Sequence, residues 1–131
     1  MIEYRRDHPL DAADVARVFD ASGIVRPTKD VARIGRMLAG ANLIISAWDG
    51  ARLVGVSRAL TDFSYCCYLS DLAVDRDYQK HGIGRELIRL TREAIGDEVT
   101  LVLLSAPAAM DYYPKAGFGL ADNAYVIRRR R

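Results

Sequence analysis

The chain has 131 residues, of which 50% are hydrophobic and 27% charged, a composition typical of a soluble globular protein. Nineteen basic and 17 acidic side chains leave a net charge of +2, which does not favour nucleic acid as a partner. No apolar run reaches the roughly 20 residues of a membrane span. The only cysteines, Cys66 and Cys67, are adjacent, so they provide neither a disulfide framework nor zinc-ligand spacing. We expect one domain over residues 1–131, in a reducing cytoplasm, without a metal site.

The N-terminal third of the chain is predicted to form a strand and two helices. The segment IEYRR at residues 2–6 is the first strand. Asp11 has the position of a helix N-cap, because apolar residues follow it at helical spacing. A break at residues 22–28 separates this helix from a second one, which Thr28 is predicted to cap and Gly40 to end.

Three strands are predicted next. Asp49-Gly50 stands between two apolar runs and is a strong signal for a β-hairpin. Residues 43–48 and 51–60 are therefore expected to pair as antiparallel strands. Residues 65–74 are aromatic and apolar on both faces, which indicates an interior strand.

The C-terminal half alternates helices and strands. The third helix is predicted to end at Gly96, and its apolar residues recur at helical intervals: Ile83, Leu87, Leu90 and Ala94. Residues 98–105 suit a buried strand, a short helix is expected to stop at Pro114, and a last pair of strands is expected near 118–121 and 124–129. This order predicts an α/β fold with a mixed, mostly antiparallel sheet and helices on both faces.

The segment DRDYQKHGIGREL (75–87) places Gly82 and Gly84 where the third helix begins. A helix N-terminus has free N–H groups and a partial positive charge, and glycine lets a ligand approach the backbone closely. Further donors and positive charges surround the same turn: Gln79, Lys80, His81 and Arg85. This chemistry suits a diphosphate, although a tight strand-to-helix turn alone would also account for the glycines.

Two other nucleotide-binding motifs do not fit this segment. A dinucleotide-binding loop needs a third glycine at position 87, where the chain has Leu87. A P-loop needs Gly-Lys followed by Ser or Thr, whereas the helix here begins Gly84-Arg85-Glu86.

Two motifs together resemble those of the Gcn5-related N-acetyltransferase (GNAT) superfamily. Gln79-x-x-Gly82-x-Gly84 resembles its acyl-CoA-binding motif, and DYYPKAGF (111–118) is similar to its Tyr-x-x-x-Gly-Phe segment, with Tyr113 at the tyrosine position. The resemblance covers about residues 43–120. Within the superfamily, the chain is also loosely similar to plastid arylalkylamine and lysine acetyltransferases.

The resemblance implies where a co-substrate would bind. Acetyl-CoA would lie between the strands at 65–74 and 98–105, which splay apart. Its pantetheine amides would pair with the backbone of Leu72, Ala73 and Val74. Its pyrophosphate would be held by the turn at the start of the third helix, made of Gln79, Lys80, His81, Gly82, Ile83, Gly84 and Arg85.

Acetyl transfer to an amine also needs groups that move protons. A lysine-like amine of pKa about 10.4 is roughly 99.9% protonated at pH 7, so a base must take a proton from it. The candidate is Asp71, which strand alternation places on one face with Leu69 and Ala73. The alternative is that Asp71 bonds to neighbouring backbone or to a basic residue.

The resemblance implies that Tyr113 donates to the leaving thiolate. A phenol of pKa about 10 is a weak acid beside a thiol of pKa about 8.5, so Tyr113 would act mainly as a hydrogen-bond donor. Pro114 disfavours helical geometry at Tyr113, which makes Tyr112 the second candidate.

The function that follows is acetyl-CoA-dependent transfer of an acetyl group to a primary amine, either a small amine or a lysine, by direct attack in a ternary complex. The resemblance implies that the loop at 22–28 and the hairpin regions shape the acceptor pocket. Arg26 is a weak sign of an acidic acceptor, whereas Asp62 and Asp71 favour a cation slightly more. One alternative is an acyl-CoA-binding sensor with little turnover. Another is a tRNA-directed toxin-type acetyltransferase that uses the basic tail, Arg128–Arg131. Similar proteins often form homodimers through their last strands.

Overall fold

A computed structural model describes all residues, 1–131. Its core is one five-stranded sheet in which the strands follow one another in chain order: β1 (Ile2–Arg6), β2 (Leu43–Asp49), β3 (Arg52–Thr61), β4 (Cys66–Val74) and β5 (Thr100–Leu103). Neighbouring strands from β1 to β4 pair antiparallel, and β5 pairs parallel with β4.

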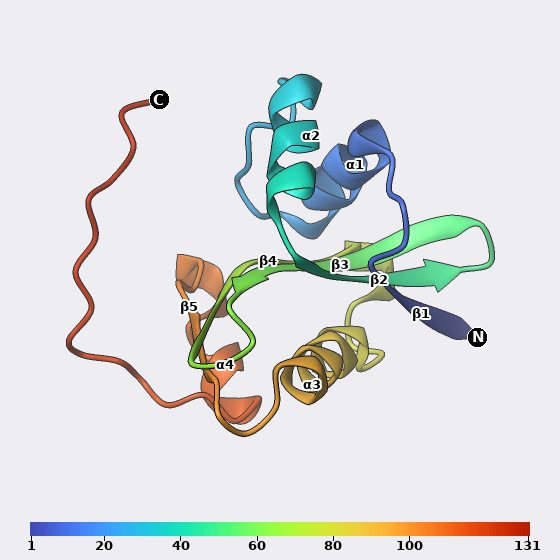
Figure 1. The fold of residues 1–131 in the computed structure, drawn as a ribbon. Coiled ribbons are helices and arrows are strands. Elements are labelled where there is room, and N and C mark those ends of the chain that lie inside the picture. Colours follow the sequence, from blue (N-terminus) through green and yellow to red (C-terminus); the bar gives the residue numbers. More distant parts are fainter.

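Helices cover both faces of this sheet. They are α1 (Ala12–Ser22), α2 (Val31–Gly40), α3 (Ile83–Ile95) and α4 (Tyr112–Lys115), with short 3₁₀ turns η1 (Arg76–Tyr78) and η2 (Pro107–Ala109). Figure 1 shows α1 and α2 on one face and α3 on the other. The predicted fold class, a mixed and mostly antiparallel sheet between helices, is thus confirmed. None of the helices is both long and apolar enough to cross a membrane.

Local sequence signals explain most of the first half of the fold. Asp11 caps α1 by accepting a hydrogen bond from the N–H of Ala13 at 3.3 Å. The hairpin between β2 and β3 turns at Asp49-Gly50, with Gly50 at φ +59°. The cap predicted for the second helix is wrong, because Asp30 accepts from the N–H of Arg33, whereas the Thr28 hydroxyl bonds to the carboxylate of Asp20. The predicted end of this helix is confirmed, because Gly40 is the last residue of α2.

A β-bulge in β4 reverses the expected alternation of its side chains. Arg58 pairs with Asp71, but the next residue of β3, Ala59, pairs with Leu69, so Ser70 is the extra residue. Leu69 therefore packs in a cluster with residue Ile95 of α3. Asp71 lies on the opposite face, so the expectation that it shares a face with Leu69 is wrong.

The two faces of the sheet have separate apolar cores, and the core on the α3 face fixes the position of the helix that follows β4. On one face, α1 and α2 pack against the sheet through a cluster that includes Val15, Val18, Phe19, Ile34, Val56 and Ala73. On the other face, Ile83 and Leu87 of α3 are almost fully buried with Ile45 and Val54 of the sheet. Burial therefore fixes the position of the first turn of α3. It also fixes the point at which the glycine-containing turn joins this helix.

The predicted helix before Pro114 is not formed. The chain makes the 3₁₀ turn η2 and then α4, which contains Pro114 as its third residue. Proline is tolerated there because the first N–H groups of a helix have no intrahelical acceptor. Tyr113 is helical, contrary to expectation, and β5 covers only Thr100–Leu103 of the predicted strand 98–105.

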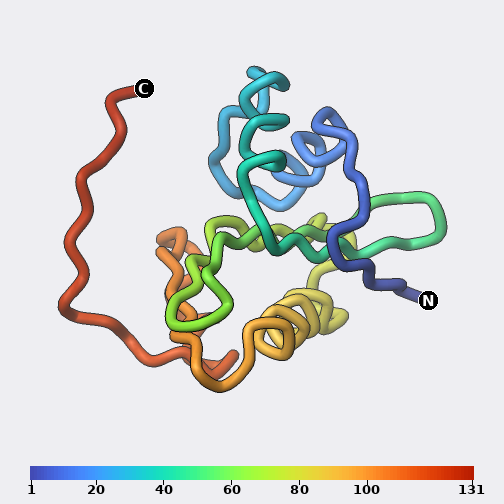
Figure 2. The backbone as a smooth tube through the Cα atoms, viewed as in Figure 1, coloured from blue at the N-terminus to red at the C-terminus, as the bar shows by residue number.

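The two strands predicted near 118–121 and 124–129 are also wrong. Residues 119–131, here called the C-terminal arm, have no secondary structure and are exposed throughout. Figure 2 shows the arm leaving the body beside α4 and running extended, apart from the sheet. A strand needs a neighbouring strand for its backbone hydrogen bonds, and the arm lies next to none in this chain.

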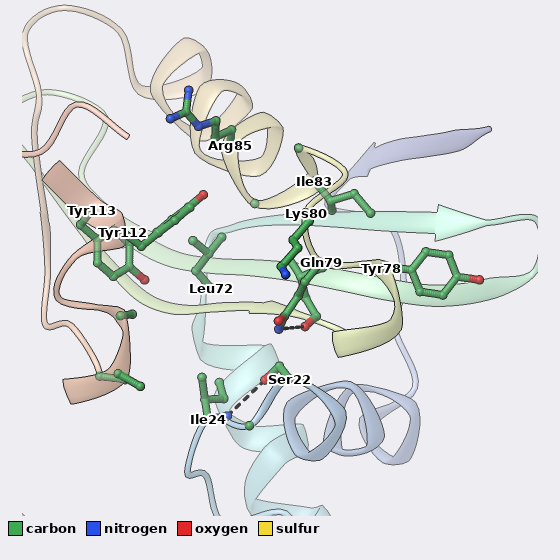
Figure 3. A pocket seen from close by; sticks show the side chains of 17 residues that line it. Ser22, Ile24, Leu72, Tyr78, Gln79, Lys80, Ile83, Arg85, Tyr112 and Tyr113 are labelled. Atoms are coloured by element: carbon green, nitrogen blue, oxygen red, sulfur yellow. Dashed lines mark hydrogen bonds between the residues drawn. The ribbon is translucent and has the colours of Figure 1, made fainter. Parts of the chain in front are cut away.

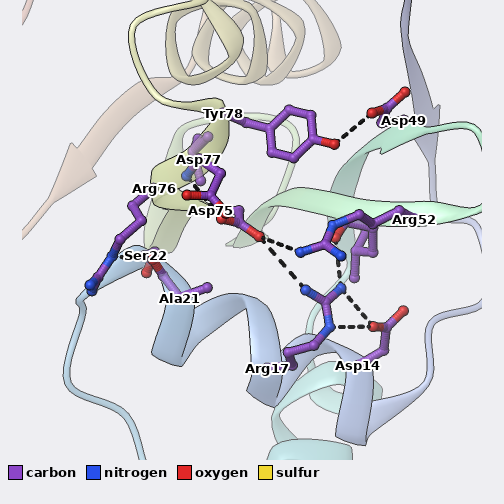
Figure 4. A network of polar contacts seen from close by, with 12 residues as sticks. Asp14, Arg17, Ala21, Ser22, Asp49, Arg52, Asp75, Arg76, Asp77 and Tyr78 are labelled. Atoms are coloured by element: carbon purple, nitrogen blue, oxygen red, sulfur yellow. Dashed lines mark hydrogen bonds and ion pairs between the residues drawn. The ribbon is translucent and has the colours of Figure 1, made fainter.

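A polar network holds the segment that follows β4 (Figure 4). The Asp75 side chain is only 3% exposed; it accepts from the N–H of Asp77 at 3.0 Å and forms ion pairs with Arg52 at 3.2 Å and Arg17 at 3.7 Å. Arg17 also donates to the carbonyl of Leu53. Burial alone would raise the pKa of Asp75, but the Asp77 N–H and the two guanidinium groups outweigh it and hold this pKa below its ordinary value.

We expect Asp75→Asn to destabilise the fold by about 1–2 kcal/mol near neutral pH, because it keeps the cap acceptor and removes the charge. The pKa of Asp75 is lower in the folded than in the unfolded protein, so its charge stabilises the fold above the unfolded pKa. That contribution is lost as the pH falls through the folded pKa. Urea unfolding should therefore give a difference between wild type and variant that shrinks below about pH 4.

The control is Asp14→Asn, which removes a partly exposed partner of Arg17 and should cost at most about 1 kcal/mol. A deficit of Asp75→Asn that stayed constant down to about pH 3 would show that packing, rather than charge, is what the substitution removes.

Candidate active site

A cavity opens where β4 and β5 part. Their parallel pairing runs from Cys66–Thr100 to Leu69–Leu103 and then stops, while β4 continues to Val74. Beside this open end of β4 lies a cavity of about 630 Å³ between the end of β4, the start of α3 and α4. Its walls include most of the predicted binding residues: Leu72, Val74, Gln79, Lys80, Gly82, Ile83, Gly84 and Arg85.

The turn into α3 presents unpaired backbone donors to this cavity. Gly82 is the N-cap at φ +77° and no side chain caps the helix, while Lys80 also has a left-handed φ of +70°. The N–H groups from Lys80 to Arg85 donate no hydrogen bond within the protein. Left-handed residues in such a turn make neighbouring N–H groups converge, and the helix end adds partial positive charge. The site is therefore suited to an anion.

The open edge of β4 supplies a second set of backbone groups. The carbonyl of Val74 points to this edge, where it accepts from the side-chain amide of Gln79 at 2.9 Å. The carbonyl of Ser70 accepts there from Arg26 at 2.8 Å. Since backbone groups alternate along a strand, the N–H and C=O of Leu72, between these two residues, point to the same edge. The side chain of Gln79 therefore occupies the last carbonyl of the open β4 edge and also lines the cavity.

Two tyrosines of α4 line the cavity, and Figure 3 shows both side chains reaching into it from the same side. A Cβ on Gly84 would come within 2.9 Å of the Tyr112 hydroxyl, so the glycine lets this phenol lie against the start of α3. The Tyr113 ring packs edge-to-face against Phe118, with 5.5 Å between centroids. Arg85 also donates to the carbonyl of Lys115 at 3.0 Å, which joins α3 to α4.

Burial raises the pKa of both phenols. For Tyr113 the neighbouring Tyr112 adds to this effect and the charge of Arg26 opposes it. For Tyr112 the charge of Arg85 opposes the effect of burial. Both groups therefore hold their protons near neutral pH and are available as hydrogen-bond donors.

Asp71 does not line the cavity. Its side chain is fully buried between two arginines: Arg26 donates to one carboxylate oxygen at 2.5 Å and Arg58 to the other. Arg58 also donates to the carbonyl of Met37 in α2 and to the hydroxyl of Ser70. Both carboxylate oxygens are thus occupied. This arrangement agrees with the alternative expectation that Asp71 bonds to a basic residue. The geometry gives no support to Asp71 as a proton acceptor, nor to Arg26 as a free group for an acidic acceptor.

Two other predicted binding residues also lie outside the walls. The Ala73 side chain is buried in the core with α1, and His81 is exposed without lining the cavity.

Several wall residues had no clear sequence signal. Ser22, at the end of α1, and Gly23 and Ile24, in the α1–α2 loop, line the cavity inside the segment expected to shape an acceptor pocket. The small side chains around η2 form another part of the wall, and the run APAA (106–109) was their only sign. Tyr78 completes the lining, which holds Lys80 and Arg85 but no carboxylate.

Comparison with known proteins gives the family. A model of the acetyltransferase (GNAT) domain matches residues 16–127. The chloroplastic GCN5-related N-acetyltransferase 2 of Arabidopsis thaliana is 30% identical over 69 residues, a stretch that covers 51% of this chain and 27% of that protein. The match thus spans about a quarter of that curated relative.

Solved structures share the fold at low sequence identity. A probable acetyltransferase from meticillin-resistant Staphylococcus aureus has a TM-score of 0.81 and 22% identity, with 98% of this chain and 100% of that chain covered. A GNAT family protein from Streptococcus pneumoniae has a TM-score of 0.78 at 22% identity over the whole of both chains. An aminoglycoside N-acetyltransferase in complex with CoA has a TM-score of 0.74 at 14% identity, with 100% and 96% covered. Because the family model spans most of the sequence and the fold agrees, the chain belongs to the GNAT acetyltransferase family.

Proposed function

We propose that the protein is an acetyl-CoA-dependent N-acetyltransferase that acts on a primary amine by direct attack in a ternary complex. Membership of the family implies acyl transfer from acetyl-CoA. The observation that carries the proposal is the cavity beside the open end of β4, because the uncapped start of α3 and the phenols of α4 share its walls.

The residues present fit the coenzyme. The free N–H groups from Lys80 to Arg85, with the charges of those two side chains, would hold the diphosphate. The backbone of Leu72 at the open edge would pair with the pantetheine amides as an added strand would. In the aminoglycoside N-acetyltransferase of the same fold, CoA is bound, which supports this assignment.

Tyr113 is proposed to stabilise the leaving group. Bound acetyl-CoA supplies a thioester whose carbonyl carbon an amine attacks. A buried phenol of raised pKa is a poor proton donor to a thiolate whose acid has a pKa of about 8.5, but it can donate a strong hydrogen bond to it. We therefore propose that Tyr113 stabilises the negative charge of the leaving thiolate by a hydrogen bond. The proton that converts the thiolate to the CoA thiol then comes from solvent.

The acceptor amine must arrive neutral or lose its proton to water. No Asp or Glu lines the cavity, and Asp71 is bound on both oxygens by arginines. Transfer should therefore depend on the fraction of free amine in solution. At pH 7 an α-amino group, of pKa about 7.7–8.0, has a far larger neutral fraction than a lysine side chain.

Neither alternative gains a specific observation. A sensor with little turnover would be favoured if Pro114 displaced Tyr113, but Tyr113 is helical and lines the cavity. The arginines that motivated a tRNA-directed enzyme, Arg128–Arg131, are exposed at the end of the arm and do not line the cavity.

A panel of primary amines with pKa values from about 7 to 10.5 tests the proposal, with release of free CoA thiol as the readout. We expect transfer to at least one class, with kcat/KM that rises about tenfold per pH unit below the pKa of the amine. CoA binding without transfer to any amine would favour the sensor. Transfer only to aminoacyl-tRNA, abolished by removing the last four arginines, would favour the tRNA-directed enzyme.

We expect Gly82→Asp to bind CoA about 10- to 100-fold more weakly than Gly82→Asn, as measured by calorimetry. Both side chains tolerate the left-handed backbone at this position and have nearly the same size. Only the Asp variant places a negative charge beside the proposed diphosphate site. Equal CoA affinities in two folded variants would show that the diphosphate lies elsewhere.

We expect Tyr113→Phe to reduce kcat about 10- to 100-fold and to leave CoA affinity nearly unchanged, because only a hydrogen bond to the leaving group is lost. Tyr112→Phe is the matched control, since it removes the neighbouring hydroxyl from the same helix. A larger loss of kcat in Tyr112→Phe would make Tyr112 the donor.

A further inference from the structure

The cavity has walls of two chemical kinds. At the start of α3 it is lined by basic side chains and free N–H groups, from Lys80 to Arg85. The α1–α2 loop and the segment around η2 contribute only small or apolar residues, here called the apolar end: Gly23, Ile24, Ala106, Ala108 and Ala109. Figure 3 shows Ile24 and Arg85 on opposite sides of the cavity. One side of the cavity therefore suits an anion, and the other suits a hydrocarbon group.

No carboxylate is available at the apolar end. The sequence offered Asp62 and Asp71 as weak signs of a cationic acceptor, but neither lines the cavity. Asp62 accepts from three backbone N–H groups in the hairpin between β3 and β4. The Asp71 side chain is fully buried between Arg26 and Arg58. A second ammonium group on an acceptor would therefore lose water at this end without gaining a counter-ion.

The charge behind the apolar end is positive, but it offers no site for an acidic group. Two guanidinium groups share the single carboxylate of Asp71, which leaves one positive charge unbalanced. This charge extends to the phenol of Tyr113, where Arg26 opposes the rise in pKa that burial causes. Each nitrogen of the Arg26 guanidinium already donates within the protein, and Arg26 does not line the cavity. A carboxylate on an acceptor would thus find no guanidinium to bind.

We propose that the acceptor is a primary amine with an apolar body and no second charged group, bound against the apolar end. This inference rests on the proposed function and names its acceptor class. The coenzyme would occupy the start of α3 and the open edge of β4, so the apolar end is the wall left for the acceptor. Burial of a hydrocarbon group there is favourable, whereas an ammonium group or a carboxylate would be desolvated without a partner. Polyamines and amino sugars are therefore poor acceptors.

Three amines of equal chain length test the inference: butylamine, 1,4-diaminobutane and 4-aminobutanoate. They differ only in the group at the end away from the reacting amine, which is a methyl, an ammonium or a carboxylate. Release of CoA thiol gives kcat/KM, expressed per neutral reacting amine so that differences in amine pKa cancel. We expect kcat/KM for butylamine to exceed that for either charged amine at least about 10-fold.

The variant Ala108→Asp supplies the counter-ion that the apolar end lacks. Ala108 lines the cavity and is exposed, so a small polar side chain can replace it without loss of core packing. The ratio of kcat/KM for diaminobutane to that for butylamine should rise at least about 10-fold in this variant. In the matched control, Ala108→Asn, the ratio should stay within about threefold of the wild-type value, because the amide has no charge. A general loss of activity cancels in each ratio, and circular dichroism establishes that both variants are folded.

Two results would overturn the inference and leave the proposed function intact. One is transfer to diaminobutane or aminobutanoate at least as efficient as transfer to butylamine. The other is the same ratio in Ala108→Asp and Ala108→Asn, which would show that the acceptor body lies against another wall. Transfer to no amine at all would instead contradict the proposed function, and the inference with it.

Discussion

The site depends on the early end of the hydrogen bonding between β4 and β5. The two strands pair only as far as Leu69 and Leu103, and β4 then continues without a neighbour. This leaves backbone groups of β4 directed at a cavity, which α3 and α4 close from the sides. A sheet paired to its end would have no such edge. The buried residues Ile83 and Leu87 hold the first turn of α3 at this opening, so that its uncapped N–H groups and the strand edge face one space.

Ion pairs hold the remaining walls, and they do so from outside the cavity. The Asp71 carboxylate binds Arg26 of the α1–α2 loop and Arg58 of β3. These ion pairs connect the loop that contains the wall residue Ile24 to β4 beside its bulge. The Asp75 network joins α1 and β3 to the segment that leads into the glycine turn. A buried charge is strongly destabilising without its partner, so each of these carboxylates favours the arrangement in which its arginines are in place. The cavity itself is left with basic groups and phenols, a lining that suits an anionic coenzyme.

The C-terminal arm and the outer edge of β5 both have backbone groups that pair with no other strand of this chain. A strand and a strand edge each have unmet hydrogen bonds, and each is stable in water only when it is paired, covered or short. This chain leaves both open at the same end of the sheet.

The sequence by itself determined the elements whose signals are local. Helix caps such as Asp11, the Asp49-Gly50 turn and the periodic apolar residues of α3 act through neighbours a few residues away, and the glycine turn was recognisable for the same reason. The tertiary structure alone decided what depends on distant partners. The bulge at Ser70 arises from pairing with β3, and it moved Asp71 to the face where two arginines bind it. Pro114 entered α4 because its missing N–H costs nothing in a first turn, and the strand-forming residues of the arm stayed unpaired because β-structure requires a neighbour.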